Sequence, residues 1–320
     1  MAAVSIDDVR SAAERLRGHA RMTPLLDGLD LSRQAGLEVR LKMETMQRTG
    51  SFKFRGASNA ILQLDPLVGA RGVATHSSGN HALALATAAR ARDFPCTVVM
   101  PHDAPQGKRR AVQEAGAAIV SCEPTMASRE TTLAEVVARG GATIIPPFDH
   151  PHVIAGQGTI GLEIVDQWPL VDVIVAPVGG GGLVGGTALA ARSIQPRVAV
   201  VAAEPIAVDD TARSVRSGVR QPPTNASTLA DGLRAGIGSL TLPLVQAHVQ
   251  QVLTVGEQDI AHWMRFVFER LKLVIEPSAA VGVAAVAAPE FRDLARSNGW
   301  RRVALVLCGG NVDLDRLPWK

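Results

Sequence analysis

Short apolar runs alternate with alanine-rich, helix-like stretches along most of this chain. Eight runs rich in β-branched residues are the strand candidates: residues 39–43, 73–76, 97–100, 118–121, 143–146, 171–178, 198–203 and 303–307. They are apolar almost throughout, which is expected of strands that are buried on both faces. Their alternation with helical stretches predicts an α/β fold with mainly parallel sheets covered by helices.

Three loops that follow these runs have an unusual composition. They are Ser-Ser-Gly-Asn-His at 77–81, a tetraglycine at 179–182 and Cys-Gly-Gly-Asn at 308–311. Ligands of open α/β sheets bind outside the carboxyl ends of the strands. We therefore expect the chemistry of this protein at these three loops.

Composition favours an ordinary globular enzyme. The chain has 320 residues, 47% of them hydrophobic, which is enough for one large core or two medium ones. Its 33 basic and 30 acidic residues are well mixed, so the net charge of +3 gives little support to nucleic-acid binding. The densest basic cluster is Lys108, Arg109 and Arg110, which we interpret as a solvated helix face.

Cysteine usage and hydropathy indicate a reducing compartment and no membrane. Cys96, Cys122 and Cys308 are widely spaced and suggest neither a disulfide framework nor a zinc site. No apolar run approaches the roughly 18 residues of a membrane span. Residues 7–20 mix acids and bases, unlike a secretory signal. We expect a cytoplasmic protein.

The tetraglycine loop has two interpretations. Glycines allow successive N–H groups to wrap a phosphate, and a helix that follows adds its positive end. Gly180, Gly182 and Gly185 also satisfy the G-x-G-x-x-G pattern of dinucleotide sites, and Glu204 lies where a ribose-binding acid is expected. The loop alone leaves a simple phosphate site and a nicotinamide site equally open.

Lys53 lies between two phenylalanines at a predicted helix start, where Ser51 is available as a cap. Flanking rings would partly desolvate the amine, which favours its neutral, nucleophilic form. Such a lysine by itself is usually a surface residue whose stem packs on its neighbours. The functional interpretation therefore depends on the other motifs.

Four motifs occur in the order and at the separations found in a known family. They are Ser-Phe-Lys-Phe-Arg-Gly-Ala at 51–57, the Ser-Ser-Gly-Asn-His loop, the tetraglycine loop and Cys-Gly-Gly-Asn-Val-Asp at 308–313. From residue 23 to residue 313 the chain resembles the serine/threonine dehydratase and serine racemase family of fold type II enzymes, which use pyridoxal 5′-phosphate (PLP). The resemblance implies a tryptophan synthase β-like fold and favours a phosphate at the glycine loop.

The resemblance also implies roles for individual residues. Lys53 would carry PLP as a Schiff base and serve as catalytic base, with Ser78 as the acid/base of the opposite face. Phe52 would lie beside the ring, Asn80 would hydrogen-bond the phenolic oxygen, and Cys308 would face the pyridine nitrogen. The phosphate would be held by Gly179, Gly180, Gly181, Gly182 and Leu183. The substrate carboxylate would bind at the helix start formed by Ser77, Ser78, Asn80 and His81.

A metal site is implied as well. Glu204, the carbonyl of Val208 and Asp210 offer hard oxygen donors and resemble the Mg²⁺ or Ca²⁺ site of the racemase branch. A solvated acidic turn is the alternative.

These roles predict a dehydratase that converts a small β-hydroxy amino acid, of the L-threonine or L-serine type, to a 2-oxo acid and ammonia. Two alternatives stay open. One is serine racemase, because Ser78 could reprotonate the opposite face. The other is a dehydratase for 3-hydroxyaspartate or another bulkier substrate, for which Arg129 could receive a side-chain carboxylate.

The spacing of the strand signals and the resemblance together predict two domains. We expect a small domain at residues 72–149 inserted in a large PLP-binding domain formed by 1–71 and 150–320. The resemblance implies a homodimer. Because the chain ends soon after the Cys308 motif, we also expect no regulatory domain and no feedback inhibition by isoleucine.

Overall fold

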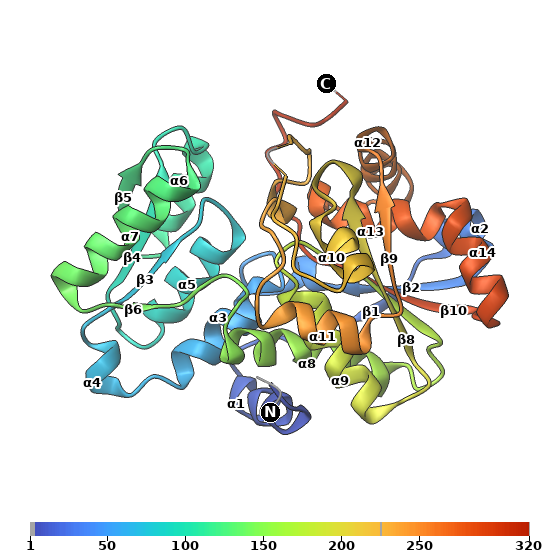
Figure 1. Ribbon diagram of the computed structural model, residues 1–320, viewed down its shortest axis with the longest axis horizontal. Helices are drawn as coiled ribbons and strands as arrows, with labels where there is room; N and C mark the ends of the chain where they lie inside the picture. Colours follow the sequence, from blue (N-terminus) through green and yellow to red (C-terminus); the bar gives the residue numbers. More distant parts are fainter. Residues whose placement is uncertain (1–3, 225, 320) are drawn as a thin grey trace.

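Two separate sheets organise the protein (Figure 1). The computed structural model describes residues 4–224 and 226–319. The six-stranded sheet has the order β1-β2-β10-β7-β8-β9, and the four-stranded sheet has the order β5-β4-β3-β6. The strands are β1 (Leu25–Asp27), β2 (Glu38–Met43), β3 (Val73–His76), β4 (Cys96–Pro101), β5 (Ala118–Cys122), β6 (Thr143–Ile144), β7 (Val173–Pro177), β8 (Ala199–Pro205), β9 (Gln251–Val255) and β10 (Arg302–Leu307).

All eight predicted strands are confirmed, and the pairing is parallel except between β1 and β2. The sequence did not predict β1 and β9, the two edge strands of the larger sheet. β1 is only three residues long, and β9 is partly exposed over most of its length. Neither forms the continuous apolar run that marks a strand buried on both faces.

Helices cover both faces of each sheet. They are α1 (Ile6–Leu16), α2 (Leu29–Ala35), α3 (Lys53–Leu62), α4 (Pro66–Gly69), α5 (Asn80–Arg90), α6 (Gln106–Glu114), α7 (Met126–Gly140), α8 (Pro151–Gln167), α9 (Gly182–Ile194), α10 (Asp210–Ser217), α11 (Thr241–His248), α12 (Glu257–Phe266), α13 (Pro277–Ala287) and α14 (Pro289–Asn298). Short helical turns are η1 (Glu44–Met46), η2 (Ile206–Val208), η3 (Asp231–Leu233) and the π-helix η4 (Val267–Leu271).

Right-handed crossovers explain which helix lies on which face. The connection from β7 through α9 to β8 and the connection from β9 through α13 to β10 run in opposite directions across the larger sheet. Right-handed connections therefore place α9 and α13 on opposite faces. α13 packs against the four strands β7 to β10, while α9 packs on β7, β8 and α8. The same reasoning separates α5 from α7 in the smaller sheet.

α3 connects the two lobes. It packs on α5 of the smaller lobe and on α8 of the larger one, and Lys53 is its first residue. The strands of the smaller sheet fall between residues 73 and 144, which supports our proposal that residues 72–149 form an inserted domain. The carboxyl ends of β3, β7 and β10 lead directly into the three unusual loops.

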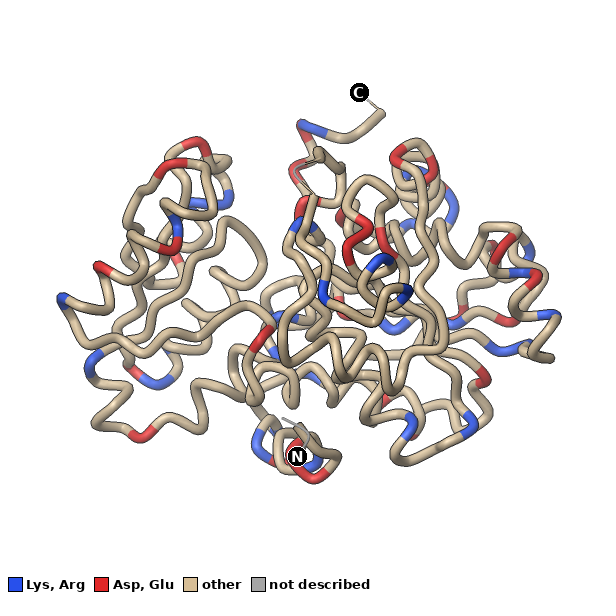
Figure 2. Tube along the Cα trace, in the orientation of Figure 1, with Lys and Arg blue, Asp and Glu red and all other residues tan. Residues whose placement is uncertain are grey.

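Charged residues of both signs are scattered over both lobes (Figure 2). β7 and β8 are buried along their whole length, and Glu204 is the one charged residue in these two strands. Within the described residues, no helix has the length and apolar character needed to cross a membrane.

Candidate active site

Lys53 is the first residue of α3, and its side chain contacts the segment between β6 and α8. Its ammonium Nζ donates a hydrogen bond to the carbonyl oxygen of Pro147 at 2.7 Å and lies 5.0 Å from the centre of the Phe52 ring. Burial lowers the pKa of Lys53 to about 8, although Cys308 and Glu276 nearby oppose the shift. At neutral pH a useful fraction of the amine is therefore unprotonated.

The expected Ser51 cap is wrong. The N-cap of α3 is Phe52, no side chain caps the helix, and the hydroxyl of Ser51 is buried without a hydrogen-bond partner among the described residues. The reason is tertiary. Ser51 forms a β-bridge with Gly309, and the N–H of Phe52 donates to the carbonyl of Cys308. The lysine segment is thus fixed by the end of β10.

The tetraglycine loop lies against Phe148, the residue after the carbonyl that Lys53 contacts. A Cβ on Gly180 would come within 2.3 Å of the Phe148 ring, so any larger residue would displace that ring. Gly181 has a left-handed φ of +84° and caps α9, a conformation that favours glycine. Lys53 therefore contacts Pro147, and the glycine loop contacts the next residue, Phe148.

Backbone donors are available at this loop. Helix geometry leaves the first N–H groups of α9, at Gly182 and Leu183, without a carbonyl acceptor inside the helix. Together with the positive end of the helix, they form a site for a phosphate group. The residues present thus fit the phosphate of PLP.

The Ser-Ser-Gly-Asn-His loop joins β3 to the start of α5, as the sequence predicted for a helix N-terminus. Ser77 Oγ accepts a hydrogen bond from the N–H of Gly79 at 3.3 Å, and Gly79 is the N-cap of α5. Ser77, Ser78, Gly79 and Asn80 are all half-buried. The loop therefore offers free helix donors beside the lysine segment.

His81 is buried and neutral. Burial lowers its pKa to about 3, with Lys53 adding to the effect, and one ring nitrogen, Nε2, lies 2.8 Å from the carbonyl oxygen of Ile145. This geometry makes Nε2 the donor and leaves Nδ1 as an acceptor without a partner among the described residues. Any contribution of His81 to carboxylate binding would thus come from its backbone, since the ring carries no positive charge.

Glu276 is a site residue that the sequence did not predict. Both of its carboxylate oxygens accept from the Asn80 amide nitrogen, at 2.8 and 2.9 Å. Asn80 in turn accepts from Asn311, the last residue of the Cys-Gly-Gly-Asn loop, at 2.8 Å. Burial raises the pKa of Glu276 to about 7, although the hydrogen bonds from Asn80 lower it. Its only sequence signal was an acid placed directly before a proline that opens an apolar helix.

Cys308 follows β10 and is buried, with 2% of its surface exposed. Burial raises the pKa of its thiol well above the ordinary value, and Glu276 adds to this effect while Lys53 opposes it. The thiol is therefore neutral at physiological pH and lies among the same groups as Lys53.

The predicted metal ligands form a separate buried acidic site. Glu204 at the end of β8 accepts from the N–H groups of Thr211 and Ala212, at 3.0 and 2.9 Å, and so caps α10. Asp210 accepts from the N–H of Ile237 at 2.7 Å. Burial raises the pKa of Glu204 to about 7, and Asp210 adds to the shift. Both oxygens of Glu204 already accept backbone N–H groups, and the described residues contain no cluster of three or more His, Cys, Asp or Glu side chains that could hold a metal ion. The cation predicted at Glu204, Val208 and Asp210 therefore stays a prediction.

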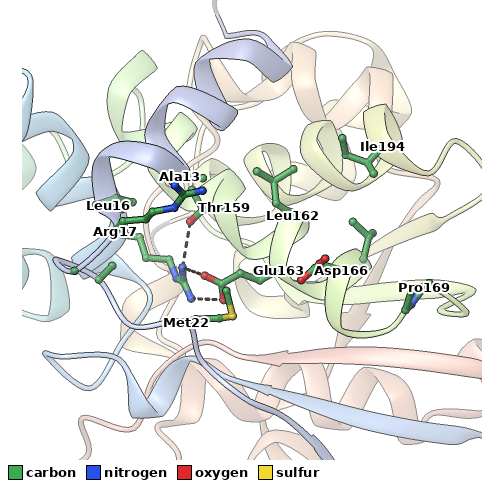
Figure 3. Close-up of a pocket in the computed structure, with 14 residues that line it drawn as sticks. Ala13, Leu16, Arg17, Met22, Thr159, Leu162, Glu163, Asp166, Pro169 and Ile194 are labelled. Atoms are coloured by element: carbon green, nitrogen blue, oxygen red, sulfur yellow. Dashed lines mark hydrogen bonds and ion pairs between the residues drawn. The ribbon is translucent and has the colours of Figure 1, made fainter.

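A cavity of about 690 Å³ opens elsewhere, between α1 and α8 (Figure 3). Its wall includes Arg55, whose guanidinium donates to Thr159 at 3.2 Å and to Glu163 at 2.6 Å. The same guanidinium donates to both oxygens of the fully buried Glu44, at 2.8 Å each. Since Arg55 pairs with both carboxylates, and Glu163 also pairs with Lys42, we interpret the cluster as an anchor of α3 and not as a second site of chemistry.

Comparisons with known proteins agree with this site. The family of pyridoxal-phosphate dependent enzymes matches residues 16–309. Serine racemase of Dictyostelium discoideum is 42% identical, over 99% of this chain and 98% of the racemase. A beta-hydroxyaspartate dehydratase of Paracoccus denitrificans (strain Pd 1222) is also 42% identical, over 98% of both chains. The solved structure of a threonine deaminase from T.th. has a TM-score of 0.88 and 37% identity, covering 97% of this chain and 99% of the deaminase.

Fold and site together define a fold type II α/β enzyme, as the resemblance implied. The chain belongs to the pyridoxal-phosphate dependent enzyme family, in the group that contains serine racemase and the serine/threonine dehydratases. This assignment decides against the dinucleotide interpretation of the glycine loop. Glu204 has a different local role, since its carboxylate caps α10.

Proposed function

We propose that this protein removes water and ammonia from a small β-hydroxy amino acid, of the L-serine or L-threonine type, and releases a 2-oxo acid. One observation carries the proposal. The amine of Lys53, with a pKa of about 8, donates to the carbonyl of Pro147, and Gly180 of the tetraglycine loop lies against the ring of Phe148, the next residue. This arrangement suits an aldehyde cofactor held by its phosphate.

The residues that would hold PLP are those expected from the sequence: Phe52, Lys53, Asn80, Gly179, Gly180, Gly181, Gly182, Leu183 and Cys308. When bound, PLP supplies an aldehyde for the substrate amine and a ring that stabilises negative charge on the α-carbon. Cys308 would meet the ring nitrogen with a neutral thiol. A neutral thiol does not hold the ring nitrogen protonated, so the ring stabilises negative charge less strongly. This favours rapid loss of a β leaving group.

Substrate binding would use the start of α5. The carboxylate would accept hydrogen bonds at the loop formed by Ser77, Ser78, Asn80 and His81, where the positive end of an eleven-residue helix favours an anion. Lys53 Nζ would then take the α-proton. Its lowered pKa brings the amine near operating pH, which is the condition for effective general base catalysis.

Racemisation is the first alternative, supported by the relative named serine racemase. Ser78 belongs to the loop at the start of α5 and would have to return the proton to the face opposite Lys53. A Ser78→Ala variant that keeps oxo-acid formation but loses interconversion of L- and D-serine would support this role. Loss of both activities would argue for a role of Ser78 in binding.

A dehydratase for 3-hydroxyaspartate is the second alternative, and Arg129 is the observation that favours it. The Nε of Arg129 is buried without a hydrogen-bond partner among the described residues. The pKa of His76, the residue just before the Ser77 loop, is lowered by burial and then by the charge of Arg129. Arg129 would thus meet a second substrate carboxylate. Arg129→Met should raise KM for 3-hydroxyaspartate far more than for L-serine.

We also propose a divalent cation, Mg²⁺ or Ca²⁺, at Glu204, Val208 and Asp210, and a cytoplasmic homodimer. The cation is supported by the two neighbouring buried carboxylates. The dimer rests on the family resemblance, and light scattering of the purified protein tests it.

The decisive experiment is an absorption spectrum of the purified protein after addition of PLP. We expect a band in the visible or near-ultraviolet that is absent from Lys53→Ala, whose activity should fall about 10⁴-fold or more, at the top of the range for loss of a catalytic acid/base. Oxo-acid release should then be measured with L-serine, L-threonine, D-serine and both diastereomers of 3-hydroxyaspartate, with and without Mg²⁺. A protein that shows no band and binds NAD would contradict the proposal.

A further inference from the structure

Asn80 lies in a chain of hydrogen bonds whose direction is fixed at both ends. The Nδ2 group of Asn311 donates to the carbonyl oxygen of Thr49 and to Oδ1 of Asn80, each at 2.8 Å. The Nδ2 group of Asn80 donates to Glu276. A backbone carbonyl and an ionised carboxylate can only accept. With both ends accepting, only one orientation of the two amides satisfies every bond.

Glu276 is held tightly in this position. It is 4% exposed, and its N–H donates to the carbonyl of Gly309. A Cβ on Gly309 would lie 2.6 Å from Glu276 Oε1, so the carboxylate packs directly on the loop that contains Cys308. The titratable groups whose charges act on it, or on which its own charge acts, come from four elements: Lys53 of α3, Lys108 of α6, Asp231 of η3 and Cys308 after β10.

We propose that Glu276 is a positioning residue that fixes the carboxamide of Asn80, so that its nitrogen end, and not its oxygen end, stays on the side of the carboxylate. The inference rests on the proposed function, because Asn80 is the residue expected to meet the phenolic oxygen of PLP. One N–H of the Asn80 amide donates to Glu276, and the second remains as a donor for the phenolic oxygen of PLP. A reversed amide would present a carbonyl oxygen to the phenolic oxygen and repel it.

Protonation of Glu276 would remove this control. A protonated carboxyl group can donate as well as accept, so it would also tolerate the oxygen end of the Asn80 amide. Because burial raises the pKa of Glu276 to about 7, the orientation should be enforced above pH 7 and relaxed below it. The thiol of Cys308 and the ring of His81 titrate well away from pH 7, but the pKa values of Lys53, about 8, and of Glu204, about 7, lie near it. The Glu276 variants therefore have to assign the transition.

The test is a pH titration of the absorption spectrum of the PLP-bound enzyme between about pH 5.5 and 8.5. We expect a spectral change with a midpoint near 7 in the wild type. Glu276→Gln should lose this transition, because its amide cannot ionise. Glu276→Asp should keep a transition, since it retains an ionisable acceptor.

Lys108 and Asp231 provide matched variants outside the hydrogen-bond chain. They form an ion pair at 2.5 Å between α6 and η3, and the charge of Asp231 raises the pKa of Glu276 while that of Lys108 lowers it. Asp231→Asn should therefore move the spectral midpoint down, and Lys108→Met should move it up, each on the order of half a pH unit. A purely structural role of Glu276 would give no such opposite shifts.

Each outcome has a distinct meaning. An unchanged transition in Glu276→Gln, or shifts of the same sign in the Lys108 and Asp231 variants, would overturn the role of Glu276. If Glu276→Gln does not fold, the Lys108 and Asp231 variants still decide. Absence of any PLP band in the wild type at every pH would instead overturn the proposed function, so the two failures can be told apart.

Discussion

Two buried polar clusters lie on opposite sides of the first turn of α3, and they handle charge differently. Around Arg55, the two carboxylates Glu44 and Glu163 meet the guanidinium directly. Burial alone would lower the pKa of Arg55 and raise that of Glu44, but their mutual attraction outweighs it and moves both the other way. This cluster holds fixed charges.

The second cluster surrounds Lys53, two residues before Arg55 in the chain. Here Lys53 donates to a carbonyl oxygen, and Glu276 accepts from the neutral amide of Asn80. Burial is not offset by an opposite charge in direct contact, so the pKa of Lys53 falls to about 8 and that of Glu276 rises to about 7. For Arg55, Glu44, Lys53 and Glu276, direct contact with an opposite charge decides the direction of the pKa shift, whereas for Lys42, which shares Glu163 with Arg55, burial outweighs its ion pair and lowers the pKa. Burial by itself does not distinguish the two clusters.

Breaking the paired cluster should have the largest effect. Arg55→Met would leave Glu44 as a buried charge without its main partner, which costs about 3–5 kcal/mol of unfolding free energy. Urea denaturation measures this loss. Arg48→Met is the control, because Arg48 is exposed and its guanidinium donates to the carbonyl of Gly18; its loss should stay below about 1 kcal/mol. Equal losses in the two variants would show that the pairing does not matter.

The unpaired cluster should respond to pH. The free amine of Lys53 is the nucleophile, so the rate of PLP uptake by cofactor-free protein should rise about tenfold per pH unit below pH 8 and level off above it. Stopped-flow absorbance gives the rate, and a lysine analogue in solution is the reference. A midpoint near 10.5, the ordinary value for lysine, would contradict the unpaired state of Lys53.

Glu204 and Asp210 sharpen the comparison, because a cation would convert this unpaired acidic site into a paired one. The pKa of Glu204 is raised from 4.5 to about 7. The stability linked to it is therefore complete below pH 4.5 and lost as pH rises through 7. Added Mg²⁺ should restore stability above pH 7, by about 1.4 kcal/mol for each tenfold excess over its Kd.

Thermal unfolding with Mg²⁺ and with EDTA measures this stabilisation. The increase in Tm should be larger at pH 8 than at pH 6 and should disappear in Asp210→Asn. Asp209→Asn is the matched control, because Asp209 is adjacent but pairs with Arg213. A Mg²⁺ response that Asp210→Asn retains would place the ion elsewhere.

Much of the fold followed from local pattern. The eight predicted strands are nearly continuous apolar runs, so they could be predicted with edges close to those observed, although β5 and β6 are partly exposed. The edge strands β1 and β9 could not, because β1 has only three residues and the apolar run of β9 is interrupted by Thr254. Ser51 was expected to cap α3 from its residue type alone. Its backbone is instead paired with Gly309, which is distant in sequence.

For the site, the sequence by itself determined which residue types stand at the ends of β3, β7 and β10, and the four motifs determined the family. It did not determine Pro147 and Phe148 as the link between Lys53 and the glycine loop, or Glu276 as the partner of Asn80. Nor did it show that Lys108 pairs with Asp231, or that the half-buried Arg109 donates to the carbonyl of Pro101, where a solvated helix face was expected. Most of these contacts join residues far apart in the chain. Hydrogen-bond partners and pKa values depend on what surrounds a group in space, and only the packing of the two lobes on α3 decides that.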